Sequence, residues 1–186
     1  MAQVNGYVPV AHGSYNQWRA ATLGNAYNVD FRYGNQCWDY CALLYWQYGL
    51  TLITKTGGGV AADCWNYSRA VNSRTPFISL TGKENIKRGD IIVWNKSAIS
   101  STGHIAFADE NYRGNKIWVL NQNPTLHGMY GSVHRDELKL DSFLGIFRNT
   151  LWTDSPEPPT PKPTKQNERK KFPWAIAWAH WPNFKH

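Results

Sequence analysis

Hydrophobic residues recur at helical spacing in the first half of this chain and at strand spacing in the second half. The helical pattern predicts helices over residues 14–21, 36–48 and 61–71, and four apolar runs predict strands over residues 91–94, 103–108, 116–120 and 145–148. Short polar segments join consecutive strands, which is typical of antiparallel pairing. Helices followed by an antiparallel meander predict an α+β domain.

The predicted helix at 36–48 carries a cysteine in its first turn. Asn35 is a good N-cap candidate, and Gly49 ends the helical repeat. In the first turn a thiol meets unpaired backbone N–H groups and the positive end of the helix macrodipole, and both favour the thiolate. Cys37 is therefore placed to be a nucleophile. The alternative is that Cys37 and Cys41 are small apolar residues on the buried face of the helix.

A thiolate nucleophile needs a base within reach and a third group that orients the base. Among the six histidines, His104 opens a predicted strand directly after a glycine, so we predict it as the base, with a purely structural histidine as the alternative. If the following hairpin is centred near residues 112–113, His104 lies opposite Asn121 or its neighbour. Asn121 and Asn123 share a face of the return strand, and either can hold the imidazole through its amide oxygen. The alternative is that both asparagines merely end the strand.

Composition narrows the functional classes. The chain has 186 residues, of which 42% are hydrophobic, and a formal net charge of +7, which fits one main globular domain. The three cysteines are odd in number and lack zinc-binding spacing, so we expect reduced thiols. No apolar run approaches the length that spans a bilayer. Nucleic-acid binding is disfavoured, because the positive charge is concentrated at the end of the chain and no recognition motif accompanies it.

Four short segments resemble, in order and spacing, the CHAP domain of bacteriophage endolysins and other peptidoglycan hydrolases. They are Tyr-Gly-Asn-Gln-Cys-Trp-Asp at 33–39, Lys-Arg-Gly-Asp-Ile at 87–91, Gly-His-Ile-Ala at 103–106 and Leu-Asn-Gln-Asn at 120–123. The resemblance covers roughly residues 10–150. It implies a papain-like fold, with N-terminal helices packed on an antiparallel β-sheet, and a cysteine–histidine pair that cuts amide bonds in peptidoglycan.

The resemblance also implies roles for individual residues. Cys37 is the expected nucleophile and His104 its base. Many CHAP domains have a glutamate where Asn121 stands, and an asparagine can orient a histidine but cannot stabilise the imidazolium with a full charge. Asn121 is therefore the expected orienting residue, with Asn123 as a second candidate. Gln36 is expected near the oxyanion, through its side chain or the neighbouring backbone.

Some CHAP endolysins bind calcium in the loop before the cysteine. The matching positions here are Asn28, Asp30 and Asp39, which offer one carboxylate fewer and therefore a weaker site. The alternative is that Asp39 is a first-turn helix carboxylate and Asp30 a loop residue. No other cofactor is expected to be required.

The composition changes sharply after residue 150. We expect residues 1–150 to form the CHAP-like catalytic domain, 151–168 a proline-rich linker and 169–186 a basic, tryptophan-rich tail. Trp174, Trp178 and Trp181 follow the basic run at 169–171 with helical spacing. The tail is expected to bind anionic wall polymers or a membrane surface, or alternatively to fold back onto the domain.

These observations predict an endolysin-type peptidoglycan hydrolase that causes bacterial lysis, a monomer whose partner is bacterial peptidoglycan. The N-terminus lacks a charged start followed by an apolar core, so we expect synthesis in the host cytoplasm without a signal peptide and action on the cell wall. Release through a membrane lesion and carriage in a virion both stay open. The alternatives are a non-catalytic wall-binding or virion structural module, and a papain-like protease that acts on proteins. The choice between amidase and endopeptidase is also open.

Overall fold

The structure is a computed structural model that describes residues 4–5, 13–54, 59–71, 75–97, 100–122 and 131–153. Asn123, the predicted linker beyond residue 153 and the predicted tail at 169–186 lie outside the described residues. Within the described part of the chain, no helix is both long enough and apolar enough to cross a membrane.

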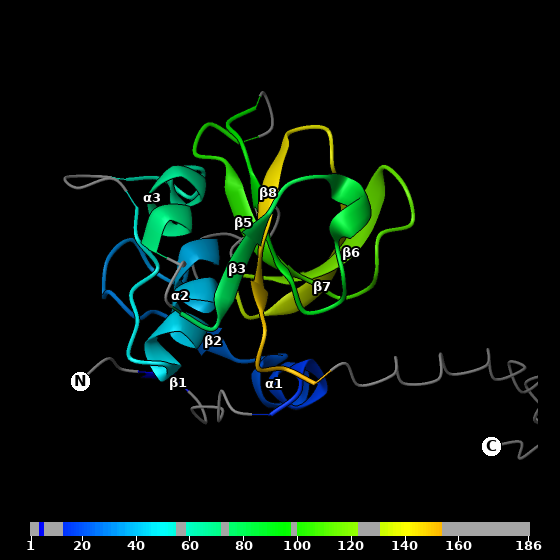
Figure 1. The fold of residues 1–186 in the computed structure, drawn as a ribbon. Coiled ribbons are helices and arrows are strands. Elements are labelled where there is room, and N and C mark those ends of the chain that lie inside the picture. Colours follow the sequence, from blue (N-terminus) through cyan, green and yellow to red (C-terminus); the bar gives the residue numbers. More distant parts are fainter. Residues whose placement is uncertain are drawn as a thin grey trace, which may run out of the picture. The chain divides into compact units, whose positions relative to one another are not determined.

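Helices and an antiparallel sheet make up the described domain, which confirms the predicted α+β class (Figure 1). The α-helices are α1 (Tyr15–Thr22), α2 (Cys37–Gln47) and α3 (Asp63–Val71), and a short 3-10 helix covers Lys83–Asn85. The strands are β1 (Val4–Asn5), β2 (Ala26–Tyr27), β3 (Phe77–Leu80), β4 (Ile91–Trp94), β5 (His104–Ala108), β6 (Lys116–Asn121), β7 (His134–Lys139) and β8 (Phe143–Asn149).

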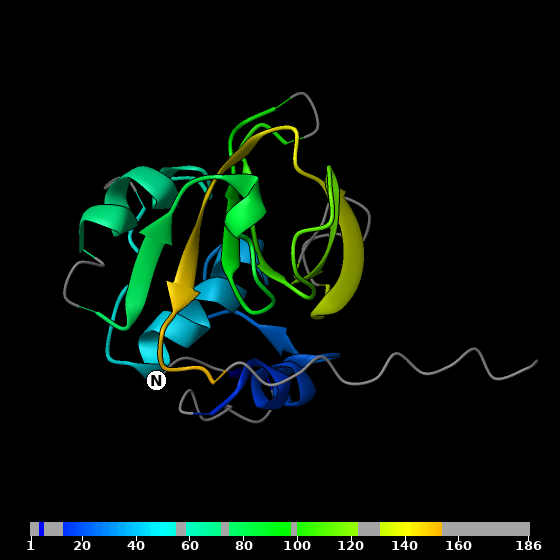
Figure 2. The same ribbon diagram turned by 45° about the vertical axis from the view of Figure 1, so that its right-hand side comes forward.

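The main sheet has the strand order β3-β8-β4-β5-β6-β7, and all neighbours in it are antiparallel. β1 and β2 form a separate two-stranded sheet. Figure 2 shows that the main sheet is strongly curved, so that β7 turns away from the helices. The two edge strands, β3 and β7, were not among the strands predicted from the sequence. β7 is half-exposed along its length and rich in charge, which suits an edge strand.

Apolar side chains pack on both faces of the central strands. One cluster lies between the helices and the sheet and includes Leu43, Leu44, Ile91, Val93, Ile105 and Phe107. A second cluster fills the other face and includes Ile92, Ala106, Val119, Leu140 and Ile146. β4 is therefore buried on both faces, as its continuous apolar run predicts. This burial makes β4 and β5 a rigid base, and β5 begins with His104.

Candidate active site

The N-terminus of α2 is held in place by one buried carboxylate. Gln36 is the N-cap, rather than the predicted Asn35, so the helix begins at Cys37. Asp39 accepts hydrogen bonds from the backbone N–H groups of Gln36 (2.9 Å), Val29 (2.8 Å) and Asp30 (3.4 Å). These bonds tie the loop before the cysteine to the first turn of the helix. Cys37 consequently has a fixed position at the helix terminus.

The thiol of Cys37 is neutral at neutral pH. Burial raises its pKa to about 11, while backbone groups of Ile105 and Trp38 lower it and the nearby Asp39 raises it slightly further. The stabilising N–H groups predicted from the helix position are present, but the loss of water outweighs them. In the resting protein, burial therefore opposes the thiolate that the helix position favours. Cys41 is completely buried in the core, which agrees with an apolar role.

His104 lies at the start of β5, where its strand neighbour fixes the ring. It pairs with Trp94 on β4, and the two rings lie 5.6 Å apart between centroids at 46°. Gly103 before it has φ +71°, and a Cβ there would meet the Trp94 carbonyl oxygen and Ala62, so only glycine fits. Burial lowers the pKa of His104 to about 4, although the side chains of Asn121 and Asp136 partly oppose this shift. The imidazole is neutral at pH 7 and can accept a proton.

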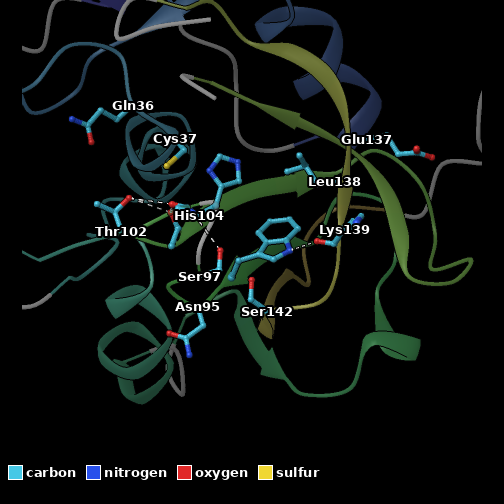
Figure 3. Close-up of a pocket in the computed structure, with 13 residues that line it drawn as sticks. Gln36, Cys37, Asn95, Ser97, Thr102, His104, Glu137, Leu138, Lys139 and Ser142 are labelled. Atoms are coloured by element: carbon cyan, nitrogen blue, oxygen red, sulfur yellow. Dashed lines mark hydrogen bonds between the residues drawn. The ribbon is translucent and has the colours of Figure 1, made fainter. Parts of the chain in front are cut away.

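Cys37 and His104 line the same pocket, which has a volume of about 460 Å³. Figure 3 shows the two side chains at one end of the pocket, with Lys139 and Ser142 further along it. Trp94 also lines the pocket. The Trp94 ring is held by a 2.8 Å hydrogen bond from its Nε1 to the Lys139 carbonyl oxygen. The pocket therefore extends from the nucleophile along an open, partly apolar wall, which suits an extended substrate.

The position of Asn121 corrects the predicted hairpin register. β5 and β6 pair Phe107 with Leu120. His104 therefore lies two residues away from the position directly opposite Asn121. The two side chains still share a face of the sheet, and the Asn121 side chain favours the protonated form of His104. Asn121 Oδ1 and His104 Nε2 are both buried and have no hydrogen-bond partner among the described residues. Whether Asn123 contributes stays a prediction.

Gln36 lies at the rim of the pocket. Its side-chain amide donates to the carbonyl oxygen of Tyr33 over 3.2 Å, and Figure 3 shows it pointing away from Cys37. Of the two routes predicted for an oxyanion donor, this arrangement favours the backbone around residue 37, because the first N–H groups of a helix have no partner within the helix.

Three polar residues near the site were missed by the sequence reasoning. Asn121 Nδ2 donates to Asp136 (3.1 Å), and Asp136 contacts His134 (2.8 Å). Gln122, directly after β6, is completely buried. Its amide donates to the carbonyl oxygens of Tyr27 (2.6 Å) and Gln36 (3.1 Å), so it links the end of β6 to β2 and to the residue before Cys37. The sequence feature that could have pointed to Gln122 was its polar side chain directly after Asn121. Asp136 and His134 gave no signal, because their strand was not predicted.

The structure gives no support to the predicted calcium site. Of its three predicted ligands, Asn28 has a buried side-chain oxygen without a hydrogen-bond partner among the described residues. The Asp39 oxygens accept hydrogen bonds from three backbone N–H groups. Asp30 Oδ1 accepts the backbone N–H of Arg32 over 2.8 Å. In the described ranges, no three His, Cys, Asp or Glu side chains lie close enough together to hold a metal ion. Asp39 instead acts as the first-turn carboxylate of the alternative prediction.

Comparisons with known proteins agree with this geometry. A family model described as the CHAP domain matches residues 25–123, more than half of the chain. A curated relative, the D-alanyl-L-alanine endopeptidase of Streptococcus phage B30, is 29% identical over 115 residues. That match covers 59% of this chain, which spans only 24% of the relative.

One solved structure shows the same fold. The crystal structure of the wild-type endolysin LysIME-EF1 matches with a TM-score of 0.56 at 21% identity, covering 74% of this chain and 64% of that one. The crystal structure of Ly7917 matches more loosely, with a TM-score of 0.44 at 13% identity over 62% of this chain and 53% of that one. The family match spans Cys37, His104 and Asn121 and the strands that bring them together. The chain therefore belongs to the CHAP domain family.

Proposed function

We propose that this chain is an endolysin-type peptidoglycan hydrolase that cleaves an amide bond of cell-wall peptides, with Cys37 as the nucleophile and His104 as the base. The observation that carries the proposal is that Cys37, at a helix N-terminus, and a neutral His104, on a rigid strand, open into one pocket. Membership of the CHAP family and the named activity of the phage B30 relative support this reaction class.

The two neutral side chains define how the reaction starts. His104 takes the Cys37 proton while the sulfur attacks the carbonyl carbon of the amide. The carbonyl oxygen becomes an oxyanion, which the free N–H groups at the start of α2 stabilise. The imidazolium then gives its proton to the leaving amine, and the C–N bond breaks to leave a thioester on Cys37. His104 finally activates a water molecule, which hydrolyses the thioester and regenerates the thiol.

The bond cleaved is proposed to lie within a wall peptide. The relative that supports this choice is named an endopeptidase, and the alternative amide joins the sugar to the peptide. Bacterial peptidoglycan is then the partner, and the wall is the place of action. The predicted wall or membrane binding by the tail at 169–186 stays a prediction.

The test is fragment release from purified peptidoglycan, analysed by mass spectrometry. Cys37→Ala should abolish release, whereas Cys41→Ala, which removes a buried thiol one turn along the same helix, should retain it. New peptide N-termini with intact sugar–peptide bonds would identify an endopeptidase. Full activity in Cys37→Ala would refute the mechanism, and a wild-type chain that binds walls without releasing any fragment would support the non-catalytic alternative.

A further inference from the structure

The orientation of the Asn121 amide follows from the group that it contacts. Asn121 Nδ2 donates to Asp136 Oδ2 over 3.1 Å. An ionised carboxylate only accepts hydrogen bonds, so the NH2 end of the amide must face Asp136 and the oxygen must face the other way. That oxygen is buried without a partner among the described residues, and so is His104 Nε2. The Asn121 side chain raises the pKa of His104, so the two side chains are neighbours in the site.

Asp136 is itself held against Asn121. The pairing of β6 with β7 places Val119 opposite Asp136 and Asn121 opposite His134. His134 Nε2 contacts the same Asp136 oxygen at 2.8 Å, and its Nδ1 contacts the Ser132 carbonyl oxygen at 2.6 Å. The carboxylate is thus clamped between an amide and an imidazole, which restricts its rotation.

We propose that Asp136 is a positioning residue that acts through Asn121: its carboxylate turns the Asn121 amide oxygen toward His104 Nε2. This inference rests on the proposed function. An acceptor at Nε2 selects the tautomer of His104 that carries its hydrogen there. Nδ1 is then left without a hydrogen, and it is the nitrogen that can take the proton of Cys37.

The same carboxylate also places a negative charge near the imidazole. A glutamate at position 121 would place a negative charge beside the imidazole, and here the negative charge lies on the adjacent strand, behind the amide. Asp136 raises the pKa of His104 and the neighbouring His134 lowers it, so the two groups oppose each other in their effect on the imidazolium. The effect expected of Asp136 is therefore the orientation of the Asn121 amide, which a neutral hydrogen-bond acceptor at position 136 can also supply.

The tautomer of His104 can be read directly by long-range proton–nitrogen NMR of the full chain labelled with 15N-histidine. The wild type should show the Nε2–H form. Asp136→Ala should show a mixture of tautomers, and kcat on a soluble muropeptide should fall about tenfold or more with little change in KM. Asp136→Asn should keep the tautomer and most of kcat, because its amide oxygen can still accept from Asn121.

A matched control removes a similar hydrogen-bonded amide–carboxylate pair outside the pocket. Asp141 is exposed and accepts a 2.6 Å hydrogen bond from the side-chain amide of Asn115, outside the pocket, so Asp141→Ala should leave the tautomer and kcat unchanged. An unchanged tautomer in Asp136→Ala, or equal losses in Asp136→Ala and Asp136→Asn, would overturn the assignment. The tautomer is measured without substrate, so this result is independent of the proposed function, which fails separately if Cys37→Ala still releases fragments.

Discussion

Lowering the pH should reveal the unusual protonation of His104. Its pKa of about 4 means that about 90% of the imidazole is still neutral at pH 5, whereas an ordinary histidine with a pKa of 6.5 would be only about 3% neutral. The difference in the amount of available base is about thirtyfold. We therefore expect activity to persist at pH 5 and to fall by half only near pH 4.

The fold has to survive at this pH for the measurement to be valid. As the pH falls below 6.5, the unfolded chain protonates His104 while the folded chain does not, which costs about 2 kcal/mol of stability at pH 5. Asp39 acts in the opposite direction, because burial raises its pKa to about 6. The folded chain protonates Asp39 between pH 7 and pH 5 and gains about 1 kcal/mol. The two effects largely offset each other, so we expect the domain to stay folded.

The assay measures initial rates of fragment release from purified peptidoglycan at constant ionic strength. Near-ultraviolet circular dichroism at each pH monitors folding, and pelleting of the inactive Cys37→Ala variant monitors binding to the wall. A half-maximal rate near pH 6.5, with folding and binding unchanged, would refute the conclusion that His104 is desolvated and neutral. A half-maximal rate near pH 4 would support it.

Three further outcomes follow from the geometry. Iodoacetamide should label Cys37 slowly at pH 7 and faster as the pH approaches 11, because the thiol pKa is raised to about 11; rapid labelling at pH 6, followed by mass spectrometry, would contradict this protonation state. Gly145→Ala should lower the free energy of unfolding, measured in thermal or urea melts, by about 1–3 kcal/mol, because its methyl group would overlap the Trp65 ring. An unchanged melting temperature would be inconsistent with that packing. EDTA should leave the lytic rate unchanged, because backbone N–H groups already satisfy Asp39; activity that is lost with EDTA and restored by calcium would contradict this.

Several features of the fold could be predicted from local patterns. The run Ile91–Trp94 is apolar on both faces and could only be a buried strand. The helix with Cys37 in its first turn was predicted to within one residue at its start, because its pattern of apolar residues is continuous. Cys37 and His104 could be proposed as the reactive pair from the sequence, because a cysteine at a helix start and a histidine after a glycine are local features.

The tertiary structure decided which strands pair and which side chains are shielded from water. β7 has a charged sequence without an apolar run, and its place beside β6 depends on hydrogen bonds between strands. Asp136 therefore could not be seen as a neighbour of Asn121 from the sequence. The hairpin register differed by two residues, because turn geometry fixes it and residue spacing alone does not. The sequence by itself determined which side chains could react. The fold determined their protonation, because the burial that makes Cys37 and His104 neutral comes from residues far apart along the chain.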